Sequence, residues 1–281
     1  MNTQKNFPRV FSCEYFPPKD DEARAKLHDT TRELAQLKPK YFSVTYGAGG
    51  STQSGTYDTV KWIRELGVDA APHISCVGAT RESIVDQLQA YKALGIKRIV
   101  ALGGDLPSGM ASPGEFRYAW QLVELIRKET ADWFHIEVAA YPEMHPRAAN
   151  FEEDLKHFRQ KVDAGANAAL TQYFYNVDAY VRFVAECEQL GLRLPIVPGI
   201  MPITNYKQLA RFSDACGAEI PRWIRKRLEG FGDDLDSIRA FGFEVTVELC
   251  EELLAAGAPG LHFYTMNRAA PTGRIWQQLG L

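Results

Sequence analysis

Short apolar segments recur along the chain, and each is followed by a polar or Gly/Pro turn and then by a stretch with helical spacing of apolar positions. This alternation is typical of strand and helix units that build a parallel sheet. We expect strands at residues 10–16, 41–47, 71–77, 98–104, 135–141, 168–174, 195–201 and 261–267. The segments between them predict helices at residues 21–37, 52–66, 81–94, 115–131, 150–164, 177–190, 204–214 and 270–279.

Eight such units fit an α/β fold of the (β/α)8 TIM-barrel type. The segment 215–259 is too long for one loop, and "DDLDSIRAFGFEVTVELCEELLAAG" predicts a long helix inserted before the last strand. No internal repeat or Ser/Gly linker marks a boundary, so we expect residues 1–281 to form one catalytic domain. A doubly wound open sheet is the competing fold, but no GxGxxG follows the first strand, and "GAGGS" after the second has the wrong spacing.

Composition and charge restrict the class of protein further. Hydrophobic residues make up 46% of the chain and charged residues 24%, which is an ordinary globular mixture. The net charge of -3 is interspersed and no Lys/Arg block occurs, so nucleic acid is not an expected partner. We expect a cytoplasmic protein with no membrane partner, because neither a signal peptide nor a membrane-length apolar run is visible. The five scattered cysteines form no CxxC pair and are expected to be reduced.

Polar residues gather at the carboxyl ends of the predicted strands, where the reactive groups of such barrels converge. Each one alone has an ordinary explanation as a cap, a backbone hydrogen bond or a core histidine, but together they indicate a site. They are Glu14, Thr45, His73, Asp105, Tyr141, Glu143, His145, Gln172, Asn267 and Arg268.

Glu14 and Asp105 have the most informative surroundings. In "FSCEYFPPKDD", Glu14 is followed by two aromatic residues and two prolines. Poor solvation there favours the neutral acid, so we expect a raised pKa and a proton donor near neutral pH. A salt bridge at the barrel rim is the alternative. Asp105 in "ALGGDLP" follows two glycines that allow the backbone to approach a ligand closely, and a turn or helix cap is its alternative.

Eight motifs together resemble the 5,10-methylenetetrahydrofolate reductase family, which are flavoprotein barrels of one-carbon metabolism. In family order over residues 11–269 they are "CEYFPP", "FSVTYGA", "AAPHISC", "GGDLP", "AAYPEMHP", "KVDAGANAALTQYFY", "PGIMPITNYKQL" and "HFYTMNRA". The resemblance implies the short bacterial form, with the catalytic barrel only. It also implies a homo-oligomer that serves methionine biosynthesis.

The resemblance implies a ping-pong reaction on FAD. NADH or NADPH reduces the flavin and leaves, and methylenetetrahydrofolate then enters and becomes 5-methyltetrahydrofolate. Glu14 matches the general acid that protonates N10 of the folate, and Asp105 matches a catalytic residue that also reads the pterin. The substrate contacts carried over are Thr45, Asp105, Gln172, Gln208, Phe212 and Arg268. The FAD contacts carried over are Tyr46, Ala48, His73, Gly104, Asp105, Ala119, Tyr141, His145, Ala148, Asp154 and Lys161.

One position departs from the family. Many members have Arg directly before the "GD" of the fourth strand, where this chain has Gly103. Either FAD binds less tightly here, or another basic residue compensates.

Three other functions remain open. A metal-dependent barrel lyase or hydrolase would use His73, Asp105, Glu143 and His145, but no HxH or HExxH pair supports a metal site. A folate- or flavin-binding protein without catalysis would not need Glu14. Another FAD-dependent barrel dehydrogenase, such as an amino-acid dehydrogenase, would share the cofactor and differ in substrate.

Overall fold

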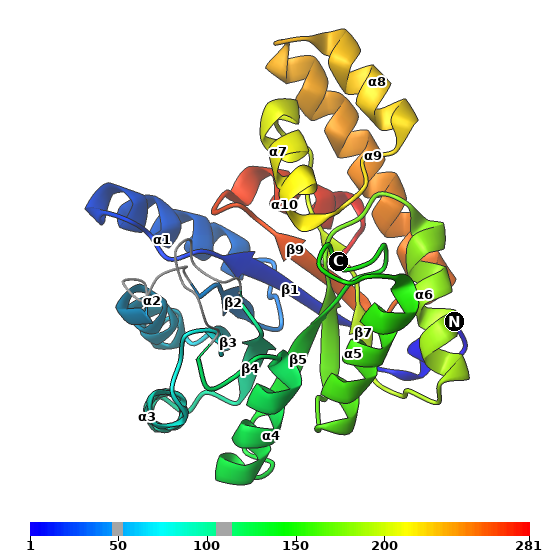
Figure 1. The fold of residues 1–281 in the computed structure, drawn as a ribbon. Helices are drawn as coiled ribbons and strands as arrows, with labels where there is room; N and C mark the ends of the chain where they lie inside the picture. The colour runs from blue at the N-terminus through cyan, green and yellow to red at the C-terminus, as the bar shows by residue number, and fades with distance from the viewer. Residues whose placement is uncertain (47–52, 105–113) are drawn as a thin grey trace.

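The structure is a computed structural model that describes residues 1–46, 53–104 and 114–281. In this part of the chain nine short parallel strands form one sheet in the order β7-β6-β5-β4-β3-β2-β1-β9-β8 (Figure 1). They are β1 (Val10–Tyr15), β2 (Phe42–Val44), β3 (Ala70–Ser75), β4 (Arg98–Leu102), β5 (His135–Ala140), β6 (Ala168–Thr171), β7 (Ile196–Val197), β8 (Gly199–Ile200) and β9 (Gly260–Tyr264).

The sheet closes through the two shortest strands. β7 pairs with β6, β8 pairs with β9, and only Pro198 lies between β7 and β8. Proline has no N–H to donate to a ladder, so the predicted seventh strand is split there while its two halves still join the two edges. The result is the predicted TIM-type barrel of parallel strands, with helices around it.

The helices alternate with the strands as predicted. After the short 3₁₀ helix η1 (Gln4–Asn6) they are α1 (Asp21–Ala35), α2 (Gln53–Glu65), α3 (Arg81–Ala93), α4 (Ala119–Thr130), α5 (Phe151–Asp163), α6 (Val177–Gln189), α7 (Tyr206–Cys216), α8 (Arg222–Phe231), α9 (Leu235–Ala256) and α10 (Ala269–Gln278). Several begin at a polar N-cap: the side chains of Asp20, Asn150 and Asn205 accept from backbone N–H groups in the first turns of α1, α5 and α7.

The insertion before the last strand contains two helices where one was predicted. The expected long helix is α9, whereas α8 was missed because "RWIRKRLEGF" offers few apolar positions beyond Ile224 and Leu228, which are its buried residues. Figure 1 shows α8 and α9 side by side at the edge of the barrel. Close packing ties α9 to the barrel, since a Cβ on Gly242 would lie 2.2 Å from the carbonyl oxygen of Ile203.

The barrel interior contains a small apolar cluster as well as buried polar groups. A buried cluster of Tyr41, Ala71, Val100, Leu170 and Val197 fills the axis. The outer core, between the strands and the helices, is a larger apolar cluster. This packing leaves the carboxyl ends of the strands as the place where polar side chains meet. Among the described residues, none of the helices combines the length and apolarity that spanning a membrane requires.

Candidate active site

The carboxyl end of β1 places Glu14 against two histidines from distant strands. Glu14 Oε2 lies 3.2 Å from His73 Nε2 of β3 and 3.4 Å from His262 Nε2 of β9. The hydroxyl of Ser43 on β2 donates to the same oxygen at 3.4 Å. Side chains from four strands therefore meet at one carboxylate oxygen: β2 and β9 flank β1 in the sheet, and β3 is the next strand beyond β2.

The prediction of a raised pKa for Glu14 is wrong in this structure. Burial raises the pKa of the carboxyl, but the nearby charge of His73 and the hydrogen bond and charge of His262 outweigh this effect, so that the pKa falls to about 2. Cationic rings beside a carboxylate favour its charged form more than poor solvation disfavours it. Glu14 is thus an ionised partner of the two rings, with 16% of its side chain exposed toward the mouth.

The main chain around Glu14 is held from the last strand. Thr265 Oγ1 donates to the carbonyl of Glu14 at 2.6 Å, and the Asn267 amide group bonds both the N–H and the carbonyl of Phe16. The turn after β1 is therefore fixed to the loop after β9. Asn267, one of the predicted strand-end residues, therefore holds the turn that follows Glu14.

The predicted FAD residues form a second group on β3, β5 and α5. His73 Nε2 is buried and, despite its closeness to Glu14, has no aligned hydrogen-bond partner in the described residues. Asp154 accepts from the backbone N–H of His145 at 2.8 Å, and the ring of His145 packs edge-on against Tyr141. Lys161 Nζ donates to the carbonyl of Ala139 on β5 at 2.6 Å.

Glycine is required at the end of β4. Gly104 has φ +86°, and a Cβ there would lie 2.0 Å from Ser75 Oγ. Arg147 Nη2 donates to the carbonyl of Gly104 at 3.3 Å, so a guanidinium lies next to Gly103, the position where many members of the family that the motifs resemble have Arg. An orphaned buried nitrogen, a close-packed glycine and two cations fit a large anionic cofactor.

The remaining predicted residues lie at the same end of the barrel but are less tightly linked. Thr45, Tyr46, Ala119, Ala148 and Gln172 all follow strands or begin helices at this end, and Gln208 and Phe212 lie on α7. Arg268 is exposed before α10 and lines a cavity of about 530 Å³ with residues of α1, α9 and α10. Among the predicted site residues that the structure describes, no other lines that cavity. Ala48 and Asp105 lie outside the described residues.

Three buried residues of the site were not predicted: Ser12, Ser43 and His262. Ser12 Oγ lies 2.7 Å from His262 Nδ1, and both side chains are fully buried in the barrel. The signal that could have found them is strand periodicity. Ser12 precedes Glu14 by two residues, so both side chains point to the same face of β1.

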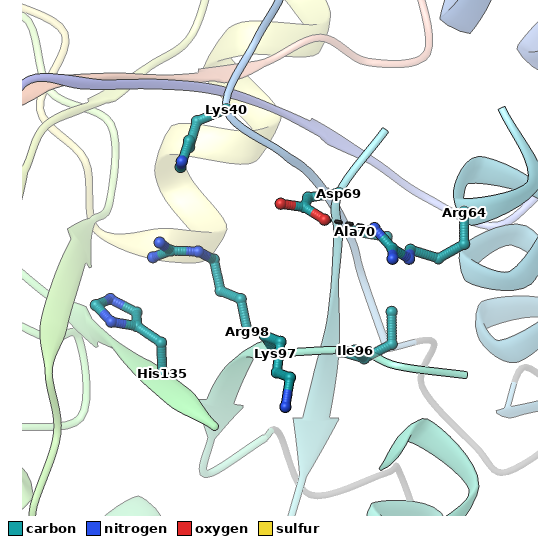
Figure 2. Close-up of a pocket in the computed structure, with 8 residues that line it drawn as sticks. All are labelled: Lys40, Arg64, Asp69, Ala70, Ile96, Lys97, Arg98 and His135. Atoms are coloured by element: carbon teal, nitrogen blue, oxygen red, sulfur yellow. Dashed lines mark hydrogen bonds and ion pairs between the residues drawn. The ribbon is translucent and has the colours of Figure 1, made fainter. Parts of the chain in front are cut away.

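A smaller cavity of about 110 Å³ lies at the opposite end of the barrel. Figure 2 shows its lining, in which Lys40, Arg64, Lys97, Arg98 and His135 surround Asp69, Ala70 and Ile96 at the amino ends of β3, β4 and β5. Arg64 pairs with Asp69, and Arg98 pairs with the buried Glu137. At this end of such barrels side chains serve stability, whereas the chemistry lies at the mouth.

Comparisons with known proteins agree with the resemblance in the motifs. The sequence model of the methylenetetrahydrofolate reductase family matches residues 2–280. The 5,10-methylenetetrahydrofolate reductases of Salmonella typhimurium and Escherichia coli are each 41% identical over 271 residues, which cover 96% of this chain and 90% of those proteins.

A solved structure supports the fold independently. A protein from Clostridium thermocellum, described as binding two copies of 5-methyl-5,6,7,8-tetrahydrofolic acid, superposes with a TM-score of 0.70 at 15% identity and covers 99% of this chain and 98% of its own. At such low identity the likeness shows the barrel architecture alone.

Proposed function

The chain belongs to the methylenetetrahydrofolate reductase family, and we propose that it reduces 5,10-methylenetetrahydrofolate to 5-methyltetrahydrofolate with NADH or NADPH. The observation that carries this proposal is the position of Glu14, a carboxylate at the mouth of the barrel that lies 3.2 Å from the buried His73 and 3.4 Å from the buried His262 and is still 16% exposed. A barrel that only bound folate would not need a proton-exchanging group at that point.

The proposal includes FAD as the resident cofactor. When bound, FAD would carry the hydride from the nicotinamide to the folate. Lys161 and Arg147 would neutralise its phosphates, His73 Nε2 would donate or accept a hydrogen bond, and Asp154 would hold a hydroxyl or amino group. The guanidinium of Arg147 beside Gly104 favours compensation for Gly103 over a loss of affinity. Tyr46, Ala48, Gly104, Asp105, Ala119, Tyr141, His145 and Ala148 complete the proposed cofactor set.

Glu14 would act on the bridge nitrogen of the folate. The methylene carbon cannot accept a hydride while it closes a five-membered ring. Protonation of N10 breaks the bond from this nitrogen to the methylene carbon and leaves an electrophilic iminium at N5. Since Glu14 is ionised beside the two rings, the proton that it delivers is one that it shares with them.

The other residues would read the two substrates in turn. A carboxylate accepts from the amino group and ring N–H of a pterin, and an amide both gives and accepts along that edge, which suits Asp105 and Gln172. Thr45 and Gln172 would also contact the nicotinamide, and Phe212 would stack on either ligand. Gln208 and Arg268 would hold the outer part of the substrate. We further propose that the enzyme works in the cytoplasm as a homo-oligomer.

An anaerobic titration of the FAD-loaded protein tests this function. We expect NADH or NADPH to bleach the visible flavin absorbance and methylenetetrahydrofolate to restore it. Glu14→Gln should still be bleached, while its recolouring by the folate should slow by about 100-fold or more. Glu252→Gln is the matched control, because Glu252 is an exposed carboxylate on α9, outside the proposed site.

Two outcomes would contradict the proposal. A wild-type protein that is bleached by NADH but recoloured by an amino acid and not by the folate would be a different dehydrogenase. Equal recolouring of wild type and Glu14→Gln by the folate would leave the function standing and remove Glu14 as the acid.

A further inference from the structure

A polar layer lies inside the barrel directly beneath Glu14. Ser12, Ser43 and His262 come from β1, β2 and β9, and all three side chains are completely buried. Strand register brings them together, since Ser12 is opposite His262 and Glu14 is opposite both Ser43 and Tyr264. Buried polar groups are retained in a core only when they are hydrogen-bonded, and a site for chemistry is one reason to retain them.

Both ring nitrogens of His262 have partners. Nδ1 lies 2.7 Å from Ser12 Oγ, and Nε2 lies 3.4 Å from Glu14 Oε2 and 3.5 Å from Ser43 Oγ. The ring is held between Tyr41, which is stacked on it at 6.2 Å, and Tyr264, which meets it edge-on at 5.4 Å. An imidazolium in this position donates Nδ1–H to Ser12 and Nε2–H to Glu14.

The other ionisable groups around His262 do not compete for its proton. Below the ring, the Tyr41 hydroxyl donates to Glu137 at 2.7 Å, and Glu137 is paired with Arg98. The Tyr41 phenol stays neutral because burial, and then the charge of Glu137, raise its pKa well above the usual value. The Tyr264 phenol also stays neutral, because burial raises its pKa. Glu14 is thus the only carboxylate in contact with the ring among the described residues.

His73 also touches Glu14, but its surroundings differ. Its Nε2 has no aligned hydrogen bond in the described residues, and its side chain is 8% exposed. His262 is 0% exposed, so its proton can leave only through Glu14 or the two serine hydroxyls. The two histidines therefore suit different tasks.

We propose that His262, positioned by Ser12, holds the proton that Glu14 delivers to the folate. The inference rests on the proposed function of Glu14. His262 Nε2–H moves to the ionised Glu14, and Glu14 passes this proton to N10. The bond between N10 and the methylene carbon breaks with its electron pair on N10, and NAD(P)H supplies the hydride that ends on the methylene carbon. After the product leaves, a proton from water reaches the neutral ring of His262 through Glu14.

The test compares His262→Gln and Ser12→Ala with Thr246→Val. Gln keeps a polar group near the Nε2 position but cannot gain or lose a proton, and Ala removes the hydroxyl that orients Nδ1. Thr246 is an equally buried residue on α9, and its hydroxyl donates to the carbonyl of Gly242 in the same helix. Binding of FAD and bleaching by NADH should be unchanged in all three variants.

Recolouring by methylenetetrahydrofolate should discriminate among them. We expect it to slow by about 100-fold in His262→Gln, with a changed pH profile, and by about tenfold in Ser12→Ala. Thr246→Val should match wild type. As a readout independent of turnover, ¹⁵N NMR of the histidine rings without folate should show that the His262 signals and their pH dependence change in Glu14→Gln.

Each outcome decides a separate point. If Glu14→Gln blocks recolouring while His262→Gln keeps the wild-type rate and pH profile, the role of His262 is refuted and the proposed function stands. Loss of both half-reactions together in His262→Gln and Ser12→Ala would show a structural role only and overturn the inference. If wild type is not recoloured by the folate, the proposed function fails, whereas the NMR experiment still tests whether His262 and Glu14 share a proton. If His262→Gln does not fold, Ser12→Ala decides.

Discussion

Lys161 shows how burial makes a cation responsive to pH. Its Nζ donates to the carbonyl of Ala139, and burial lowers the pKa of the amine to about 8, although Asp154 acts in the opposite direction. Below pH 8 the group is an ammonium ion that can offset phosphate charge, and above pH 8 it is a neutral amine. The proposed cofactor site therefore contains a cation that is lost just above neutral pH.

We expect the affinity for FAD to fall as the pH rises through about 8. Lys161→Gln should bind FAD less tightly at pH 7 and lose most of this pH dependence, because its side chain carries no charge at any pH. Lys156→Gln is the control, since Lys156 is exposed on the same helix. Titration of the flavin fluorescence at pH 6, 7, 8 and 9 measures the effect. A wild-type affinity that is flat over this range would refute a phosphate contact by Lys161.

At the same scale, the sequence identified Glu14 but not its charge state. The aromatic and proline neighbours of Glu14 are visible in the local sequence, and they correctly predict burial. The two histidines that lower its pKa come from β3 and β9, and only the closed barrel brings them within 3.4 Å. His262 was not predicted because it precedes the last residue of β9 by two positions. A histidine at such a buried position is ordinarily part of the core.

Among the elements, β9 depends on a glycine at its first position. Gly260 pairs with Val10 across the seam between β1 and β9 and has φ +121°. A Cβ there would lie 1.7 Å from the carbonyl oxygen of Val10, so no side chain fits without moving β1. This seam carries Ser12, Glu14 and His262 two and four residues further along.

Gly260→Ala should lower the free energy of unfolding by about 2 to 4 kcal/mol, through backbone strain and overpacking. The matched control is Gly273→Ala in α10, where nothing lies within 4 Å of an added Cβ. That change should raise stability by about 0.5 to 1 kcal/mol, since alanine favours a helix over glycine. Urea denaturation followed by circular dichroism measures both. Equal stability of the two variants would show that the seam yields easily.

The strand and helix order was predictable because each unit has its own apolar period. The predicted strands lie on the observed ones with differences of a few residues at their ends, where the ladder stops before the apolar run does. The division of the seventh strand at Pro198 and the extra helix α8 were not predicted. The proline in this apolar run does not reveal that the residues before it pair with β6 and the residues after it pair with β9. The helix α8 is short and highly charged, and it buries only one apolar stripe against α9.

For the whole molecule, closing the barrel involves the first residues of the chain as well as the strands. Figure 1 shows the N-terminus beside α6, and Thr3 donates to Glu188 at the end of that helix. Gln4 is 1% exposed; its Nε2 donates to the carbonyl of Leu194 at 3.1 Å and its Oε1 accepts from the N–H of Ile196 at 2.8 Å. The segment before β1 is therefore hydrogen-bonded to the residues that lead into β7.

Gln4→Ala should lower the free energy of unfolding by about 2 to 4 kcal/mol, because it leaves one buried carbonyl and one buried N–H without a partner. Asn6→Ala, at an exposed position, is the control and should change stability by no more than about 0.5 kcal/mol. Since this tie precedes β7, at the end of the barrel away from Glu14, FAD affinity should be the same in both variants. Urea denaturation and flavin titration of the same samples measure stability and FAD affinity separately. A loss of FAD affinity without a loss of stability would contradict this prediction, because it would mean that the hydrogen bonds of Gln4 affect the mouth of the barrel and not its closure.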